Sequence, residues 1–198
     1  MNPLHNYKTT DTLDFRNNRG QLIMSYAIRG AGVLIFGYLL HTLVLSMHEN
    51  VSFRQLMSIE IAGIPSWVSI LLLIANIAGV LYLHELIHAL VFYLTHRQLP
   101  QIGWRGWTIF ASAPEHVLSP RSLIINALAP FTIISLMGVI LLSKMSLSYL
   151  SWVFIPTLVN AAASGGDFMA VWFVAKQKRG IRFNDQGDMI YALEEKAE

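Results

Sequence analysis

Residues 83–89 read LHELIHA and lie inside an apolar run that begins near Trp67. The stretch contains the pattern H-E-x-x-H. On a helix this spacing places His84 and His88 on one face, where two imidazoles can bind one metal ion. Glu85 is adjacent and is placed to take a proton from water rather than to bind the metal. Because ionisable side chains inside an apolar helix are costly, the pattern predicts a metal site. The alternative is that the three side chains only pair with one another.

The composition is that of a membrane protein. Of the 198 residues, 54% are hydrophobic and 13% are charged, whereas soluble domains carry about 25% charged residues. The length fits a single domain, 1–198. The absence of cysteine excludes disulfides and thiolate metal ligands. We expect no nucleic-acid partner, because the basic residues flank hydrophobic segments as the positive-inside rule requires.

Four apolar segments are long enough to cross a lipid bilayer as helices, at about 24–47, 66–96, 122–143 and 149–175. The predicted fold is therefore an all-α membrane protein with a polar lead-in, 1–20, and a polar tail, 180–198. The loop 98–121 contains Trp104 and Trp107 among glycines, which favours a short β-hairpin at the membrane interface. This hairpin would serve either as an aromatic belt or as an edge strand that binds an extended substrate. The mixed segment 48–63 favours a short interfacial helix on the outer side.

The basic residues predict the orientation of the chain in the membrane. If both termini are cytoplasmic, the inner segments carry 12 of the 14 Lys and Arg residues, and the outer segments carry only Arg54 and Lys144. This asymmetry places the N-terminus and the C-terminus inside.

A catalytic zinc site usually has three protein ligands, so a third is expected beside the two histidines. Asp167 is the only acidic residue between Glu115 and Asp185. His88 and Asp167 each lie nine residues before the basic residue that ends their helix, which corresponds to a depth of roughly 13 Å in both cases. The small residues 161–166 allow close helix packing. Asp167 is therefore predicted as the third ligand, the alternative being a buried aspartate bonded to a neighbouring helix.

Further polar residues are candidates for supporting roles. Asn160 lies seven residues before Asp167, on nearly the same helix face, and could bond a metal ligand or a bound peptide. Asn126, in the third predicted helix, is a second candidate for substrate binding. For both, hydrogen bonding between helices is an equally good interpretation. Glu115 and His116, in the loop, are the rival ligands or acid–base groups.

Four short stretches between residues 75 and 175 carry a family resemblance: HELIH at 84–88, SPR at 119–121, NALAP at 126–130 and SGGD at 164–167. In these the chain is similar to the putative zincin peptidases, small bacterial membrane proteins with four helices, whose layout resembles that of site-2 proteases. The chain departs from the site-2 protease pattern in one place. Those proteins have an Asp-Gly motif preceded by prolines, whereas here two glycines precede Asp167.

The resemblance implies an intramembrane zinc metalloprotease in the bacterial cytoplasmic membrane. His84, His88 and Asp167 would bind Zn²⁺, and Glu85 would act as general base. The substrate would be a membrane protein or peptide, hydrolysed within or beside the bilayer, with water reaching the site from the cytoplasmic side. The alternative function is a non-catalytic membrane scaffold with a structural metal or a polar core. A metal transporter and a di-iron lipid enzyme fit less well, because too few acids and histidines converge.

Overall fold

The computed structural model describes residues 3–48, 51–98, 100–105 and 108–196. Its long helices are α1 (Arg19–Met47), α3 (Ser66–His96) and α4 (Pro120–Lys144), followed by the pair α5 (Ser151–Ala163) and α6 (Gly165–Lys176). These elements form four apolar spans long enough to cross a membrane, with α5 and α6 together making the fourth. The four predicted spans are thus confirmed by length and composition.

The fourth span is not the continuous helix predicted for 149–175, because it is divided at Ser164. The hydroxyl and the backbone N–H of Ser164 both donate to the carbonyl of Asn160, at 3.0 Å. A serine that bonds back in this way bends a helix, and the glycines that follow have low helix propensity. The division therefore comes from the same small residues that were predicted to allow close packing.

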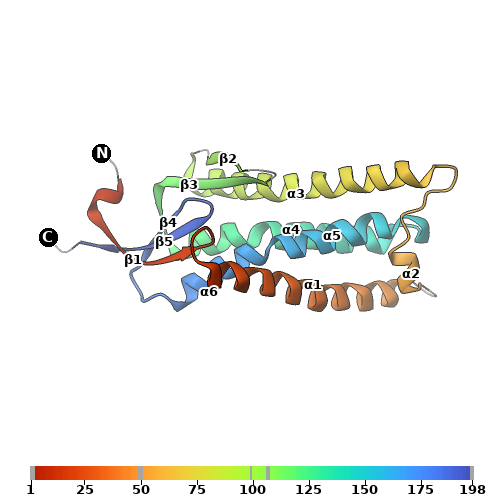
Figure 1. Ribbon diagram of the computed structural model, residues 1–198, viewed down its shortest axis with the longest axis horizontal. Coiled ribbons are helices and arrows are strands. Elements are labelled where there is room, and N and C mark those ends of the chain that lie inside the picture. The colour runs from red at the N-terminus through yellow and green to blue at the C-terminus, as the bar shows by residue number, and fades with distance from the viewer. Residues whose placement is uncertain (1–2, 49–50, 99, 106–107, 197–198) are drawn as a thin grey trace.

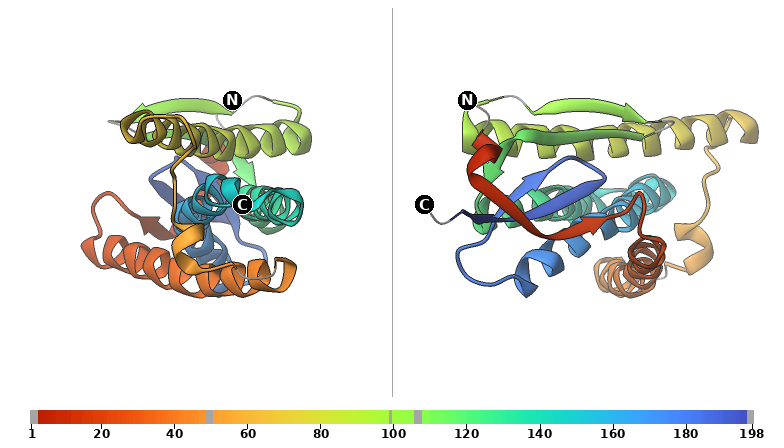
Figure 2. Two further views of the ribbon diagram at one scale, coloured as in Figure 1. Left: turned by 90° about the vertical axis from the view of Figure 1, so that its right-hand side faces the viewer. Right: turned by 60° about the vertical axis from the view of Figure 1, so that its left-hand side comes forward.

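The helices pack in three layers, with α4 and α5 lying between α1 and α3 (Figures 1 and 2). Helix α6 continues from α5 and packs against α1 and α4. Many large apolar side chains of α1, α3 and α4 are exposed, as expected for surfaces that face lipid. At one end of the bundle, the short helix α2 (Phe53–Leu56) begins with a capping box made by Ser52 and Gln55. It packs on a buried apolar cluster formed by Leu40, Val44, Val51, Leu56, Leu142, Leu150 and Phe154.

The opposite end carries an antiparallel five-stranded sheet, so the prediction of an all-α fold is wrong. Its order is β1-β5-β4-β3-β2. The strands are β1 (Tyr7–Asp14), β2 (Gln101–Arg105), β3 (Thr108–Leu118), β4 (Arg182–Asp185) and β5 (Met189–Glu195). The lead-in therefore contains a 3₁₀ turn, η1 (Pro3–Asn6), and a strand, and the tail contains two strands. β1 pairs with β5 along nearly their whole length, so the predicted polar lead-in and the polar tail form one part of the sheet together.

The predicted hairpin in the 98–121 loop is present as β2 and β3, which pair from Gln101 with Ser112 to Arg105 with Thr108. Residues 99, 106 and 107, and with them Trp107, lie outside the described residues. The β3–β4 ladder is irregular around Pro114, which has no N–H to donate. The buried side chain of Asn184 compensates by donating to the carbonyls of Ala113, Pro114 and His116, at 2.9–3.3 Å.

The sheet packs on the nearby ends of the helices over a second apolar core. This core consists of Leu13, Phe92, Ala113, Leu118, Leu123, Ala127, Met169, Ala170, Phe173, Val174, Ile181, Phe183, Ile190 and Ala192. The first and last strands both lie at this end of the molecule (Figure 1). The two apolar cores thus occupy opposite ends, and the polar groups of α3 and α6 lie between them.

Candidate metal centre

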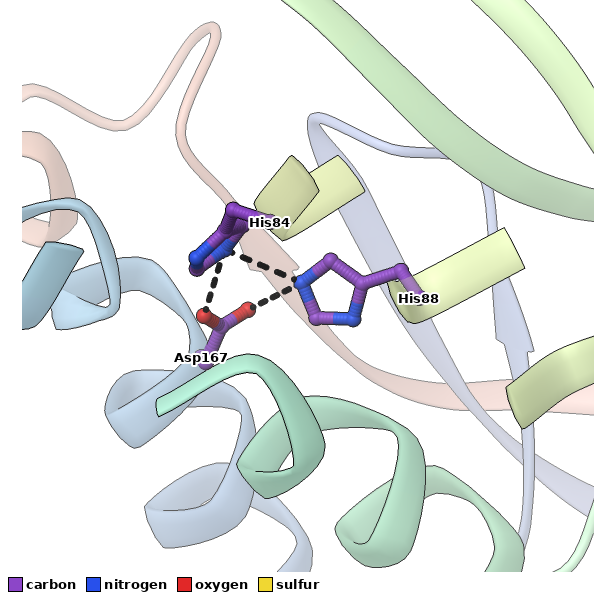
Figure 3. Close-up of side chains that lie close together, drawn as sticks. All are labelled: His84, His88 and Asp167. Carbon is purple, nitrogen blue, oxygen red and sulfur yellow. Dashed lines mark hydrogen bonds and ion pairs between the residues drawn. The ribbon is translucent and has the colours of Figure 1, made fainter. Parts of the chain in front are cut away.

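Three side chains from two helices converge on one point. His84 and His88 come from α3 and Asp167 from the first turn of α6 (Figure 3). The Nε2 atoms of the two histidines are 3.2 Å apart. Each Nε2 also lies 3.4 Å from a different carboxylate oxygen of Asp167. Within the described residues, this is the one group of three or more potential ligands close enough to hold a metal ion.

The spacing of the three side chains fits a zinc ion. At zinc–ligand distances of about 2.0–2.1 Å, two ligands of a tetrahedral site are about 3.3 Å apart. The separations of 3.2 Å and 3.4 Å match this value. Two imidazole nitrogens and a carboxylate that face each other also repel unless a cation lies among them. Two histidines and one carboxylate, with a further position open, make up a common catalytic zinc set.

The first histidine is oriented by a neighbouring helix. His84 is buried, and its Nδ1 lies 2.9 Å from Oδ1 of Asn160 in α5. With Nδ1–H donating to that oxygen, the lone pair of His84 lies on Nε2 and points at Asp167. Asn160 is 0% exposed, so water does not compete for this bond. Asn160 was predicted to bond either a metal ligand or a bound peptide, and the structure places it against His84, a predicted ligand.

The second histidine is oriented by a backbone group. His88 Nδ1 lies 3.0 Å from the carbonyl oxygen of Asn126 in α4. A carbonyl can only accept a hydrogen bond, so Nδ1 carries the proton and Nε2 is left for a metal. The side-chain oxygen of Asn126 is buried without a hydrogen-bond partner among the described residues, and Asn126 lines the cavity described next.

A cavity of about 490 Å³ adjoins the three ligands. Glu85 lines it beside both histidines, as the general-base assignment requires. One face of α1 forms a wall, through Leu22, Ser25, Tyr26 and Arg29. The cavity also reaches the β4–β5 turn, at Asp185, Gly187 and Asp188, and the β1–α1 link, at Phe15 and Arg16. The site therefore lies between the membrane-spanning helices and the sheet.

Sequence reasoning missed several residues of the cavity, among them Arg29 and Asp185. Arg29 was counted only for topology, although an arginine ten residues inside an apolar helix is itself a signal of function. Gly165 makes room for the Arg29 side chain, because a Cβ on this glycine would clash with Cγ of Arg29. Asp185 lies in the segment predicted as tail. Burial raises the pKa of Asp185 to about 6, partly opposed by the hydrogen bond from the N–H of Gly187.

The rival ligands lie elsewhere. Glu115 is exposed on β3. His116 contacts Gln98 through Nε2, and its ring packs edge-on against Phe92, with ring centroids 5.3 Å apart. The structure therefore brings His84, His88 and Asp167 together with Glu85 and keeps Glu115 and His116 outside the cluster.

The arrangement agrees with a comparison against known families. A family model described as putative zincin peptidase matches residues 77–182, just over half of the chain. The chain belongs to this family. The matched part of the zincin peptidase domain runs from α3 into β4 and contains all three potential ligands, Glu85 and both asparagines. No curated protein and no solved structure matches the chain. Family membership indicates a zinc-dependent peptidase, and α1 and β5 lie outside the matched range.

Proposed function

We propose that this protein is an intramembrane zinc metalloprotease. The observation that carries the proposal is the position of His84, His88 and Asp167, which face one another within two apolar spans and adjoin a cavity lined by Glu85. A structural metal would need no cavity on its open side, whereas hydrolysis needs space for water and for a peptide. The cavity thus favours catalysis over the alternative of a scaffold with a structural metal.

The residues of the chain divide the chemistry among them. A bound zinc ion would polarise the scissile carbonyl and make the attacking water more acidic. Glu85 takes the proton from the water as its oxygen bonds to the carbonyl carbon, and delivers it to the amide nitrogen as the C–N bond breaks. Asn160 and the Asn126 carbonyl hold the two histidines in the tautomer that leaves Nε2 without a proton.

Substrate binding is assigned to the walls of the cavity. A transmembrane helix hides its carbonyls in hydrogen bonds, so a membrane substrate must unwind locally before cleavage. The α1 face with Arg29 supplies a cation beside the ligands, suited to the oxygen of the carbonyl under attack. The described part of the cavity wall takes its sheet residues from the β4–β5 turn rather than from the 98–121 hairpin. Substrate pairing at the β2 edge of the sheet stays a prediction.

The distribution of basic residues supports an orientation of the protein in the membrane. The sheet end carries the helix termini near Arg97, Arg121 and Lys176, and the α2 end carries Arg54 and Lys144. By the positive-inside rule, the sheet end and both termini face the cytoplasm. Water would then reach the cavity from the side of the sheet.

The test is a cleavage assay with purified protein in lipid vesicles, using a reporter with one transmembrane segment and an unfolded soluble protein as substrates. Glu85→Gln is expected to lower turnover by about 100- to 10,000-fold while zinc remains bound. The matched control is Glu115→Gln, which removes a carboxylate outside the cluster and should keep wild-type turnover. Equal turnover in wild type and Glu85→Gln would contradict the catalytic assignment. A zinc-loaded wild type that cleaves neither substrate would favour the scaffold.

A further inference from the structure

Two prolines lie inside the membrane-spanning helices and create the same defect. Pro130 lies within α4 and Pro156 within α5, and both are buried. Proline has no N–H, so the carbonyl four residues earlier loses its α-helical partner. These carbonyls belong to Asn126 and Trp152 respectively. In a membrane, another group must satisfy each of them.

Both carbonyls are satisfied by side chains of α3, but by different kinds of side chain. The Trp152 carbonyl accepts a hydrogen bond from Nδ2 of Asn76, at 2.8 Å. The Asn126 carbonyl accepts one from Nδ1 of His88, at 3.0 Å. Asn76 lies outside the ligand cluster, whereas the other nitrogen of His88 faces His84 and Asp167.

We propose that Pro130 is a positioning residue for the metal ion. Its missing N–H leaves the Asn126 carbonyl available to His88, and this bond fixes both the ring orientation and the proton position of that ligand. The inference rests on the metal site of the proposed function but not on peptidase activity. It assigns a role to the NALAP stretch at 126–130, in which the important groups are a carbonyl and an absent N–H.

The physical argument is one of competition. With any other residue at position 130, a backbone N–H would point at the Asn126 carbonyl along the helix axis. Closing this bond draws the carbonyl back into line with the helix and away from α3, so the bond to Nδ1 of His88 lengthens or is lost. Proline inside a helix is destabilising, so its presence beside a ligand's acceptor calls for a compensating gain. Hydrogen bonds to the second nitrogen of a ligating histidine supply such a gain in metal affinity.

The experiment measures the zinc dissociation constant of the purified full-length chain by competition with a chelator, at one fixed pH. Pro130→Ala is expected to weaken zinc binding by about 10- to 100-fold. Pro156→Ala is the matched control: it restores an N–H to a carbonyl that serves only Asn76, and its zinc affinity should equal that of the wild type. Equal zinc affinity in wild type and Pro130→Ala, or an equal loss in both variants, would overturn the proposal.

A second variant separates the missing N–H from the proline ring. Replacing Pro130 by the α-hydroxy analogue of alanine puts an ester at this position, which lacks the N–H as proline does and also lacks the ring. This variant should bind zinc as the wild type does, even if Pro130→Ala fails to fold. A loss of affinity in the ester variant would show that ring packing matters instead, and would overturn the proposal.

The outcomes also distinguish this inference from the proposed function. A wild type that binds zinc, shows the expected difference between the two alanine variants and cleaves no substrate would support the positioning role and contradict the peptidase. If the wild type cleaves substrate and Pro130→Ala leaves zinc affinity unchanged, the peptidase is supported and the positioning role is contradicted. A wild type that binds no zinc would overturn both.

Discussion

The helices α4 and α5 carry the same backbone defect, yet one defect serves the candidate metal centre and the other serves only packing. In each, a buried proline leaves a carbonyl without its helical partner, and a side chain of α3 takes that carbonyl. Asn76 lies outside the ligand cluster, whereas Nε2 of His88 also faces His84 and Asp167. The comparison indicates that the effect of each proline depends on the side chain that bonds the freed carbonyl: a potential metal ligand in one helix and an asparagine outside the cluster in the other.

The largest expected difference comes from removing the two α3 side chains in turn. His88→Ala should weaken zinc binding by more than the roughly 100-fold that loss of an outer hydrogen bond costs, because a ligand itself is removed. Asn76→Ala should leave zinc affinity unchanged and lower the free energy of unfolding by about 1 kcal/mol, the usual worth of such a bond between membrane helices. Chelator competition and denaturation in detergent give the two quantities. A loss of zinc affinity in Asn76→Ala would contradict the claim that only the His88 contact, and not the Asn76 contact, serves the metal site.

A smaller effect is expected at the other histidine, which is held by a side chain instead of a backbone group. Asn160→Ala should weaken zinc binding by about 10- to 100-fold, because Nδ1 of His84 loses its acceptor. Asn160→Asp keeps an acceptor oxygen and should retain most of the affinity. The two variants are compared in the same chelator assay. Equal affinity in Asn160→Ala and wild type would mean that packing alone orients His84.

The smallest predicted effect lies in the sheet and concerns pH. The pKa of Asp185 is raised to about 6 from its ordinary value of 3.8. The folded state therefore holds this proton more tightly than the unfolded state, and stability is lost as the pH rises from about 4 through about 6. Asp185→Asn keeps the acceptor for the Gly187 N–H and should remove this loss, so that the variant is more stable than the wild type at pH 7. The measurement is the free energy of unfolding of metal-free wild type and Asp185→Asn at pH 4 and pH 7. If the change in this free energy between the two pH values is the same in both proteins, the prediction is contradicted.

The four spans could be predicted from sequence because about 20 consecutive apolar residues are a strong local signal. The approach of His84 to His88 could also be predicted from a local signal, because residues four apart lie on one helix face. That Asp167 lies close to the two histidines could be predicted from depth, because charged residues are rare in apolar spans and both helices end at basic residues. Its role as a metal ligand stays a prediction. The spans and the histidine pair were inferred from signals close in sequence, whereas Asp167 was matched to His88 by depth across two helices.

Apart from the β2–β3 hairpin, the sheet was not predicted, because the β1–β5 and β3–β4 pairings that join its strands are long-range. Tyr7 pairs with Glu195 across nearly the whole chain, and the polar strand 7–14 lacks the alternation of apolar residues that marks a half-buried strand. The roles of Asn160 and of the Asn126 carbonyl also depend on which helices meet. The sequence shows a proline four residues after Asn126, but only the packing of α3 on α4 shows that His88 takes the freed carbonyl.

The most direct test of the account is the zinc content of purified wild type, His84→Ala and Asp167→Ala. The account predicts about one zinc ion per chain in the wild type and a clear loss in both variants, because a three-ligand site cannot spare a ligand. The two variants change different helices, α3 and α6, so a shared loss would place one ion between them. Zinc retained in Asp167→Ala, or no zinc in the wild type after resupply, would contradict the central claim.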